Sequence, residues 1–245
     1  MAFNKESNTY IISFSVIMVL VVGTLLAVVA TGLKPLQKEN LRNEKMQYIL
    51  NSALIPADRA EAGGMFNDYV TNRIIIDFNG NVVSENSGDV DPLNKEDAFN
   101  IDFIKEYKRK SLKAEDKNYP FFVCEKEGKK FYVVPVVGKG LWDLIWGYIC
   151  IEENGTTVYG TVFDHKAETP GLGSKITEDF FEQAFIGKTI EKAGSFSKIK
   201  VFKPGKDLDN QMVDGISGGT FTSVGVQEMM DRTLKIYYDY FKKNK

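Results

Sequence analysis

The chain has 245 residues, of which 43% are hydrophobic and 26% are charged, and its formal net charge is -2. A chain of this length can build one large domain or two small ones, and the composition is that of an ordinary globular protein. The near-neutral charge offers no broad basic surface, so we expect no nucleic-acid partner. Two cysteines and one histidine are too few for a tetrahedral structural zinc site.

The first predicted element is a membrane-spanning helix at residues 10–33. Residues 7–33 contain no charged side chain. A helix over residues 10–33 would extend roughly 36 Å, which is enough to cross a bilayer. Tyr10 suits one membrane interface and Lys34-Pro35 suits the other. The alternative is a cleaved signal peptide, but its apolar run is typically shorter than this one, so we expect an uncleaved anchor.

Charge alone does not decide which side of the membrane holds the rest of the chain. The tail before the helix carries Lys5, whereas several basic residues follow it: Lys34, Lys38, Arg42 and Lys45. Counted simply, the positive-inside rule places the large domain in the cytoplasm. Long domains can translocate largely regardless of charge, however, and Glu39 and Glu44 are interleaved with these basic residues.

Three elements are predicted between the anchor and residue 120. Residues 33–55 favour an amphipathic helix that links the membrane to the domain. Its apolar face would consist of Leu36, Met46, Ile49, Leu50, Ala53 and Leu54. Residues 72–85 predict a β-hairpin, because two apolar runs flank Asn79-Gly80, a pair that tolerates the positive φ of a tight turn. Residues 94–111 favour a helix with a charged outer face.

The second half of the chain predicts a sheet. Residues 120–163 alternate apolar and aromatic runs with glycine-containing turns, which is typical of a meander of antiparallel strands. Residues 164–176 form a Gly/Pro loop, and residues 177–190 have helical spacing with Thr177 as the N-cap. The last predicted helix carries one apolar stripe: Val226, Met230, Leu234, Tyr237 and Phe241. We therefore expect an α+β fold in which one transmembrane helix precedes an antiparallel sheet with flanking helices.

The first candidate site is the stretch DGISGGTFTS at residues 214–223. Gly218 and Gly219 let a ligand approach the backbone closely, and the N–H groups that start the following helix can hold an anion. Ser217 and Thr220 add hydroxyl groups.

The alternative for this stretch is a simple turn in which Thr222 or Ser223 caps the helix. Taken alone, the stretch favours this alternative, because no GKS or GKT follows as it would in a nucleoside-triphosphate loop.

The second candidate stretch is HKAETPGLG at residues 165–173. A hydrolase would need His165, the only histidine, as a base beside Ser217 or Ser223, but the chain has no GxSxG elbow. We therefore expect His165 to be a surface or hydrogen-bonding residue. Glu168 is expected to support the loop. Leu172, which lies between two glycines, is expected to cover a flat group with its apolar side chain.

The third candidate stretch is GKGLWDLIWGYI at residues 138–149. Trp142 follows a Gly-Lys-Gly turn, where it either packs in the core or presents its ring to an aromatic ligand. Together the three stretches could form the walls of one pocket for a ring system that carries a phosphate, such as FMN.

In these three stretches the chain resembles the C subunit of the sodium-translocating NADH:quinone oxidoreductase, a family that binds FMN covalently. The resemblance rests on GKGLWD at 138–143, HKAETPGLG at 165–173 and DGISGGTFTS at 214–223, in this order. It implies an electron-carrier subunit of a bacterial inner-membrane complex, which relays electrons toward quinone while the complex exports sodium. Its partners would be the other subunits and a flavin transferase that takes FMN from FAD.

The resemblance also implies domain boundaries and a topology. Residues 1–9 would be a cytoplasmic tail, residues 10–33 the transmembrane helix, residues 34–120 a membrane-proximal periplasmic part, and residues 121–245 the FMN-binding domain. The large domain is thereby expected in the periplasm, against the simple charge count.

The family pattern for flavin attachment is Asp, Gly or Ala, any residue, Ser or Thr, Gly, Ala, Thr. Residues 214–220 match it except that Gly219 replaces the alanine. The resemblance implies a phosphoester between FMN and the Thr220 hydroxyl, with the ring between Trp142 and Leu172. The other implied contacts are Asp214, Ser217, Gly218, Gly219, Thr222, Glu168, Thr169, Gly171 and Gly173.

Two alternatives stay open for the chain as a whole. The G subunit of the ion-translocating ferredoxin:NAD oxidoreductase shares the flavin motif, although the long segment between Lys34 and Pro120 favours the quinone-reductase family. A membrane-anchored binding domain without a redox role is the other. Cys124 and Cys150 lie in strand-like runs and are expected to be buried hydrophobes, with a disulfide as the alternative.

Overall fold

The computed structural model describes residues 7–109, 113–202, 205 and 209–244. The chain divides into two compact units, residues 1–44 and 45–245. A single helix, α1 (Asn8–Ser52), makes up the described part of the first unit and continues into the second. Within the described residues, α1 is the one helix long and apolar enough to cross a membrane. The sequence predicts a boundary near residue 33, but the helix runs on through Pro35.

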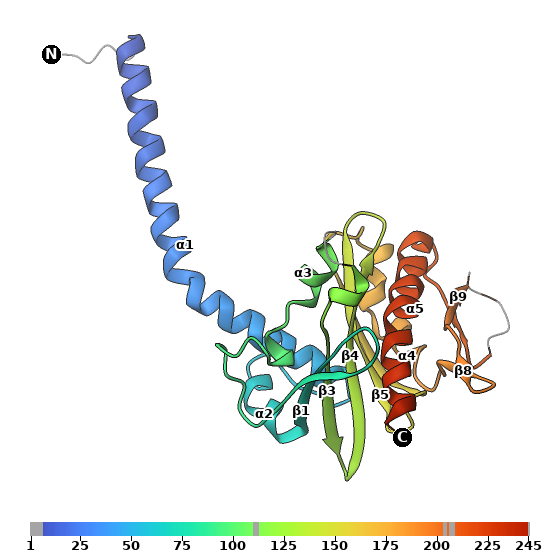
Figure 1. Cartoon of the computed structure of the whole chain (residues 1–245). Coiled ribbons are helices and arrows are strands. Elements are labelled where there is room, and N and C mark those ends of the chain that lie inside the picture. Colours follow the sequence, from blue (N-terminus) through green and yellow to red (C-terminus); the bar gives the residue numbers. More distant parts are fainter. Residues whose placement is uncertain (1–6, 110–112, 203–204, 206–208, 245) are drawn as a thin grey trace. The chain divides into compact units, whose positions relative to one another are not determined.

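The second unit is built on an antiparallel sheet of six strands in the order β2-β1-β3-β4-β5-β6 (Figure 1). Their bounds are β1 Val70–Ile76, β2 Val82–Ser87, β3 Tyr119–Lys126, β4 Lys129–Lys139, β5 Leu144–Glu152 and β6 Val158–His165. The predicted meander is confirmed as β3 to β6. The predicted hairpin is β1 and β2, and it joins the same sheet because β1 pairs with β3.

The turn of the β1–β2 hairpin shows why it carries Asn79-Gly80. The Asp77 carboxylate accepts hydrogen bonds from the backbone N–H groups of Asn79 and Asn81, both at 2.8 Å. Gly80 has a φ of +75°, and a Cβ there would lie 3.2 Å from the backbone of Tyr240. The position therefore favours glycine for its backbone conformation and for space.

Short elements surround the sheet. The helical ones are α2 (Ala62–Tyr69), η1 (Ala98–Asn100), α3 (Phe103–Lys108), η2 (Ala114–Asp116), η3 (Gly173–Thr177), α4 (Asp179–Gln183) and the long α5 (Thr220–Lys243). The remaining strands are β7 (Glu191–Lys192) and β8 (Ser195–Phe196), which pair with each other, and β9 (Lys200–Phe202) and β10 (Met212–Asp214), which run parallel.

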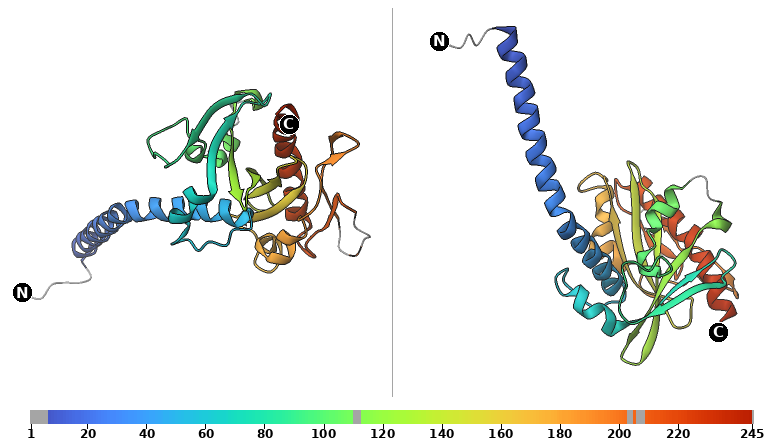
Figure 2. Two further views of the ribbon diagram at one scale, coloured as in Figure 1. Left: turned by 90° about the horizontal axis from the view of Figure 1, so that it is seen from below. Right: turned by 60° about the vertical axis from the view of Figure 1, so that its left-hand side comes forward.

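Each face of the sheet buries its own apolar cluster. Neighbouring residues of a strand point to opposite faces, so Phe121 belongs to one cluster and Phe122 to the other. On the first face α5 packs through its predicted stripe, all five residues of which are buried. On the second face lie α2 and the end of α1, through Met46, Ile49 and Leu50, together with Ala53 just after the helix. The α+β prediction is confirmed as helix, sheet and helix in three layers (Figure 2).

Two residues assigned to the apolar face of residues 33–55 do not belong to it. Leu54 lies beyond the end of α1 with a φ of +54° and is 40% exposed. Leu36 is 57% exposed and lies in the first unit. The amphipathic part of the helix is therefore shorter than predicted and is confined to its last turns.

Residues 94–111 do not form the single helix that was predicted. Two aspartates interrupt it, because each caps a new short turn. The Asp97 side chain accepts from the N–H of Phe99 at the start of η1, and that of Asp102 accepts from the N–H of Lys105 in α3. Aspartate competes in this way with the interior bonding of a helix. Residues 110–111 lie outside the described part of the chain.

Thr177 is not an N-cap. It ends η3, and its hydroxyl donates to the Ser174 carbonyl. The helix α4 begins after Glu178 and spans only Asp179–Gln183. The predicted helix over residues 177–190 is thus reduced to this short helix.

Cys124 and Cys150 are buried and free. They lie on β3 and β5, with β4 between the two strands, where they face Phe131 and Val133 respectively. The disulfide alternative is therefore wrong. Burial raises the pKa of the Cys124 thiol to about 12 and that of Cys150 well above its ordinary value, so both behave as buried hydrophobes.

The side chain of Lys45 fastens the end of α1 to the domain. Its ammonium donates to the carbonyls of Phe99 (2.5 Å) and Ile101 (3.1 Å) and lies 4.9 Å from the centre of the Phe99 ring. Burial lowers the pKa of Lys45 to about 8, although the charges of Asp102 and Asp97 oppose this shift.

The lowered pKa of Lys45 predicts that the domain becomes more stable in mild alkali. Between the folded pKa of about 8 and the ordinary value of 10.5, the unfolded chain binds more protons than the folded chain. The contribution is therefore fully present above 10.5 and is lost as pH falls through 8. We expect the free energy of unfolding to gain about 2 kcal/mol from this residue between about pH 7 and pH 9.5. Urea unfolding of the wild type and of Lys45→Met checks this, and an identical pH dependence in both would contradict it.

Candidate cofactor site

The three stretches singled out in the sequence meet at Glu168. This residue lies in the loop after β6 and is only 4% exposed. Its Oε1 accepts from the backbone N–H of Trp142 in the β4–β5 loop at 3.0 Å. Its Oε2 accepts from the hydroxyl of Thr222 in the first turn of α5 at 2.5 Å. One carboxylate thus joins segments that lie far apart in the chain.

Glu168 favours its ionised form. Burial raises its pKa, but hydrogen bonds from Thr222 and from the backbone of Trp142, Leu141 and Asp143 outweigh that effect and hold the pKa below its ordinary value. The expected role of Glu168 as a support of the loop agrees with these contacts.

Two glycines make room for this carboxylate. A Cβ on Gly140 would lie 2.4 Å from Glu168 Oε1, and a Cβ on Gly173 would lie 2.5 Å from Oε2 and 2.4 Å from the Thr222 hydroxyl. Any larger residue would push Glu168 away from the backbone groups it accepts from. Gly140 was not among the predicted site residues, although its place in the Gly-Lys-Gly turn was a signal.

Trp142 and Leu172 are not core residues. Trp142 is 65% exposed, and its indole N–H donates to the Thr169 hydroxyl at 3.0 Å. Leu172 is 43% exposed on the loop that contains Glu168. The core-packing alternative for Trp142 is therefore wrong, and the two loops present both apolar side chains to the surface. Leu141 and Phe221, which were not among the predicted site residues, are exposed on segments of the same site.

The start of α5 is the second feature of the site. Gly219 occupies the N-cap position, and no side chain caps the helix there within the described structure. The capping alternative is wrong, because Thr222 bonds to Glu168 and the Ser223 hydroxyl accepts from the N–H of Ile216. The N–H groups of this first turn therefore keep the partial positive charge of an open helix end.

Thr220 is the first residue of α5 and its side chain is exposed. Ser217 and Gly218, just before it, are also exposed, and Gly218 has a φ of +76° that favours glycine. A Cβ on Gly219 would lie 2.9 Å from Ile216 Cγ2. The alanine of the family pattern therefore does not fit this loop without a shift, and Gly219 allows a closer turn.

Two further site residues have structural signs of their own. Asp214 ends β10, and within the described structure its buried Oδ1 has no hydrogen-bond partner. A buried polar atom of this kind points to a group that the chain alone does not supply. Gly171, with a φ of +76°, donates its N–H to the Ser174 hydroxyl and turns the loop back toward η3.

His165 does not form a catalytic pair in the described structure. Its Nδ1 accepts from the backbone N–H of Glu168 at 3.3 Å, and no hydrogen bond joins it to Ser217 or Ser223. His165 is a hydrogen-bonding residue of the loop, and the geometry does not support a hydrolase.

The comparisons with known proteins agree with this geometry. A family model described as an FMN-binding domain matches residues 140–235, a range that begins at Gly140 and contains the rest of the site. The crystal structure of the C subunit of the Na(+)-translocating NADH-quinone reductase from Parabacteroides distasonis is 37% identical. The match covers 85% of this chain and 96% of that one, with a TM-score of 0.74. The chain belongs to the family of these C subunits.

Other members of the C-subunit family are similar over most of the chain. The crystal structure of Shewanella oneidensis NqrC is 28% identical, over 82% of this chain and 96% of that one, and has a TM-score of 0.65. The C subunit of the Vibrio vulnificus reductase is 28% identical over 93% of this chain and 89% of that protein. Its counterpart in Neisseria meningitidis is 27% identical over 92% and 89%. The predicted family is confirmed.

Proposed function

We propose that this chain is the flavin-bearing electron carrier of a Na(+)-translocating NADH:quinone reductase, with FMN joined by a phosphoester to the Thr220 hydroxyl. The observation that carries the proposal is the position of Thr220. It combines an exposed hydroxyl with an uncapped helix end in a segment that matches an FMN-binding domain. Family membership supplies the complex in which the carrier works.

The residues present suit a phosphorylated ring system. The open N-terminus of α5 favours a phosphate, and the exposed Ser217 and Gly218 leave the backbone accessible beside it. Trp142 and Leu172 supply apolar surface for the ring, and Glu168 and Thr169 hold Trp142 in its orientation. When bound, FMN supplies electron-transfer chemistry at a potential that the surrounding groups tune.

The attachment itself requires a separate transferase with FAD as the donor. The Thr220 oxygen would hold FMN through a bond to its phosphorus, formed as the phosphoanhydride bond of FAD breaks and AMP leaves. The hydroxyl proton would pass to a base of the transferase or to water. Because Thr220 is exposed at the start of α5, the modifying enzyme has access to it in the folded domain.

We place the chain in the bacterial inner membrane with a single span. Residues 1–9 form a cytoplasmic tail and residues 10–33 cross the bilayer, as the exposed apolar surface of α1 supports. Residues 34–120 then lead into the FMN-binding part, residues 121–245, in the periplasm. The span has no charged residue with which to build an ion path, so sodium export belongs to the other subunits.

Peptide mass spectrometry of protein from the native membrane tests this proposal. We expect one adduct with the mass of FMN less one water, on the peptide that contains Thr220. The same protein should give a fluorescent band on a denaturing gel under ultraviolet light. Flavin-free protein, or an adduct on another residue, would contradict the attachment.

Trp142→Ala is expected to change the flavin while leaving its attachment intact. The indole is exposed and lies outside the helix that carries Thr220, so its loss should not prevent modification. A stacking contact is worth about 0.5–1.5 kcal/mol, which corresponds to roughly 10–30 mV for a two-electron couple. Spectroelectrochemistry should show a shift of this size and an altered visible spectrum, with Trp142→Phe closer to the wild type. An unchanged spectrum and potential would remove Trp142 from the ring site.

A further inference from the structure

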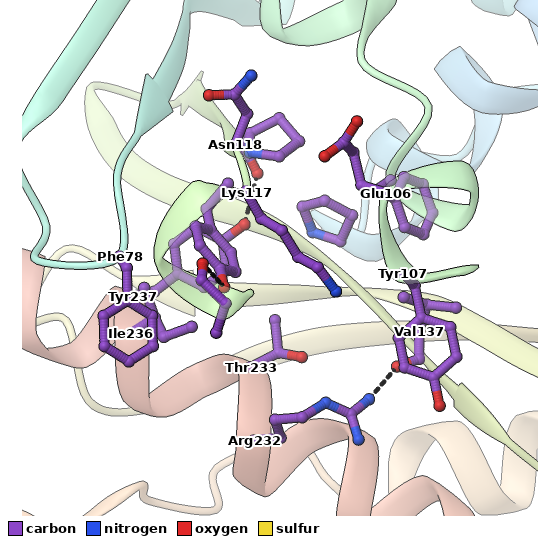
Figure 3. A pocket seen from close by; sticks show the side chains of 15 residues that line it. Phe78, Glu106, Tyr107, Lys117, Asn118, Val137, Arg232, Thr233, Ile236 and Tyr237 are labelled. Atoms are coloured by element: carbon purple, nitrogen blue, oxygen red, sulfur yellow. Dashed lines mark hydrogen bonds between the residues drawn. The ribbon is translucent and has the colours of Figure 1, made fainter. Parts of the chain in front are cut away.

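A cavity of about 150 Å³ has a lining that includes none of the cofactor-site residues. Figure 3 shows the side chains that line it. The cavity is lined by residues of α3, η2, the segment before β3, and β3, β4 and α5. Arg232, which lines it, follows Thr220 by twelve residues on α5, or about 18 Å along the helix axis. Nothing in the function proposed above uses this cavity.

Aromatic rings form much of the wall. Tyr107 comes from α3, Tyr119 begins β3 and Tyr237 comes from α5. The Tyr119 hydroxyl donates to the Ala114 carbonyl at 2.9 Å, and the Tyr237 hydroxyl donates to the Pro120 carbonyl at 2.7 Å. Because both phenols are satisfied within the chain, their rings offer carbon rather than polar atoms to a ligand.

The size of the cavity limits what it can hold. An apolar cavity of about 150 Å³ in another protein accepts one benzene ring. Pro135, Val137 and Ile236 complete the lining with further apolar atoms. A single six-membered ring with a small substituent suits this volume and these walls.

The charged groups of the cavity favour an anion. Figure 3 shows the Lys117 side chain extended across the cavity, with its ammonium toward Arg232. Within the described structure Lys117 forms no ion pair. Arg232 donates one N–H to the Val137 carbonyl at 2.6 Å, which leaves other guanidinium donors. Among the described residues that line the cavity, Glu106 is the acidic one, and it pairs with Arg109 at 3.3 Å.

We propose that this cavity binds a small monocyclic aromatic carboxylate. The ring lies against Tyr119 and Tyr237, and the carboxylate accepts from Lys117 and Arg232. Two basic groups at the edge of an aromatic cavity match a ligand that carries its negative charge directly on a ring. The site is independent of the flavin and requires no chemistry at Thr220.

Calorimetric titration of the full chain in detergent with sodium benzoate tests the proposal. We expect saturable binding at one site, with benzyl alcohol and sodium acetate each at least tenfold weaker, since one lacks the charge and the other the ring. Methyl NMR signals of Val137 and Ile236 should shift on addition of benzoate. Those of Ile49 and Ile75, which do not line the cavity, should not.

A pair of lysine variants assigns the charge. Lys117→Gln should weaken benzoate about tenfold or more, because it removes a charge-assisted bond. Lys113→Gln, an exposed lysine close in sequence that does not line the cavity, should change the affinity less than twofold. Absence of benzoate binding, equal binding of benzyl alcohol, or equal loss in both variants would each overturn the proposal.

Discussion

Thr220→Val is expected to remove covalent flavin completely and to leave the domain folded. Valine keeps the shape of threonine but lacks the oxygen that would form the phosphoester. The side chain is exposed at the first residue of α5, so no buried contact is lost. Intact-mass analysis after co-expression with the transferase should show an adduct on the wild type and none on the variant. The fluorescent band on a denaturing gel should disappear with it.

Three matched variants separate the attachment from the integrity of the loop. Thr220→Ser retains a hydroxyl at the same place and should keep an adduct. Ser217→Ala removes an exposed hydroxyl from the same turn and should also keep it. Thr222→Val breaks the bond to Glu168 and should weaken the loop without removing the acceptor oxygen. Thermal unfolding of each variant reports whether the domain is intact, and an FMN adduct on Thr220→Val would refute the assignment.

Asp97→Ala should lower the free energy of unfolding by about 3–5 kcal/mol, because it leaves the charge of Arg73 buried without its partner. Arg73 is 1% exposed, and its Nε and Nη2 donate to the Asp97 carboxylate at 2.9–3.0 Å. Its Nη1 donates to the Gly88 carbonyl at 2.6 Å. Asp97 also caps η1 through the N–H of Phe99. The loss is large beside the total of about 5–15 kcal/mol typical of a domain.

An exposed ion pair on the same sheet provides the control. Glu125 lies 3.8 Å from Lys130, and both side chains are about half exposed. Glu125→Ala should therefore cost less than about 1 kcal/mol. Urea unfolding of both variants checks the comparison. The two variants could instead lose free energies of unfolding that agree within about 1 kcal/mol. The Arg73–Asp97 pair would then not stabilise the contact between the hairpin and the segment after it. Adding Arg73→Met to Asp97→Ala should recover part of the stability, since it removes the stranded charge.

Local patterns account for the elements that were predicted well. The hairpin at Asn79-Gly80 and the meander of β3 to β6 depend on alternation and turn residues that neighbours in the sequence already determine. The predictions that were wrong concern residues whose side chains bond to distant segments of the chain. Asp97 turns to Arg73, 24 residues away, and it also caps the short η1 in place of a longer helix.

The cofactor site likewise combines features that the local sequence predicts with features that depend on contacts between distant segments. Its residues could be named from three motifs, but the motifs did not reveal that one carboxylate connects them. Glu168 and Thr222 are 54 residues apart, and their hydrogen bond exists because the sheet brings the loop after β6 against the first turn of α5. The same packing leaves α5 uncapped, since Thr222 and Ser223 are both bonded elsewhere.

By itself the sequence determined the uncharged anchor, the strand and helix periods, and the attachment motif that ends in Thr220, because each of these is a relation between near neighbours along the chain. Only the tertiary structure decided which polar groups have hydrogen-bond partners within the domain and which stay available to a ligand. Contacts between distant segments produce four features of the domain. These are the burial of Arg73, the hydrogen bonds of Glu168, the uncapped start of α5 and the cavity beside Lys117. Such contacts follow from how the sheet pairs and how both its faces are covered, and no local pattern encodes them.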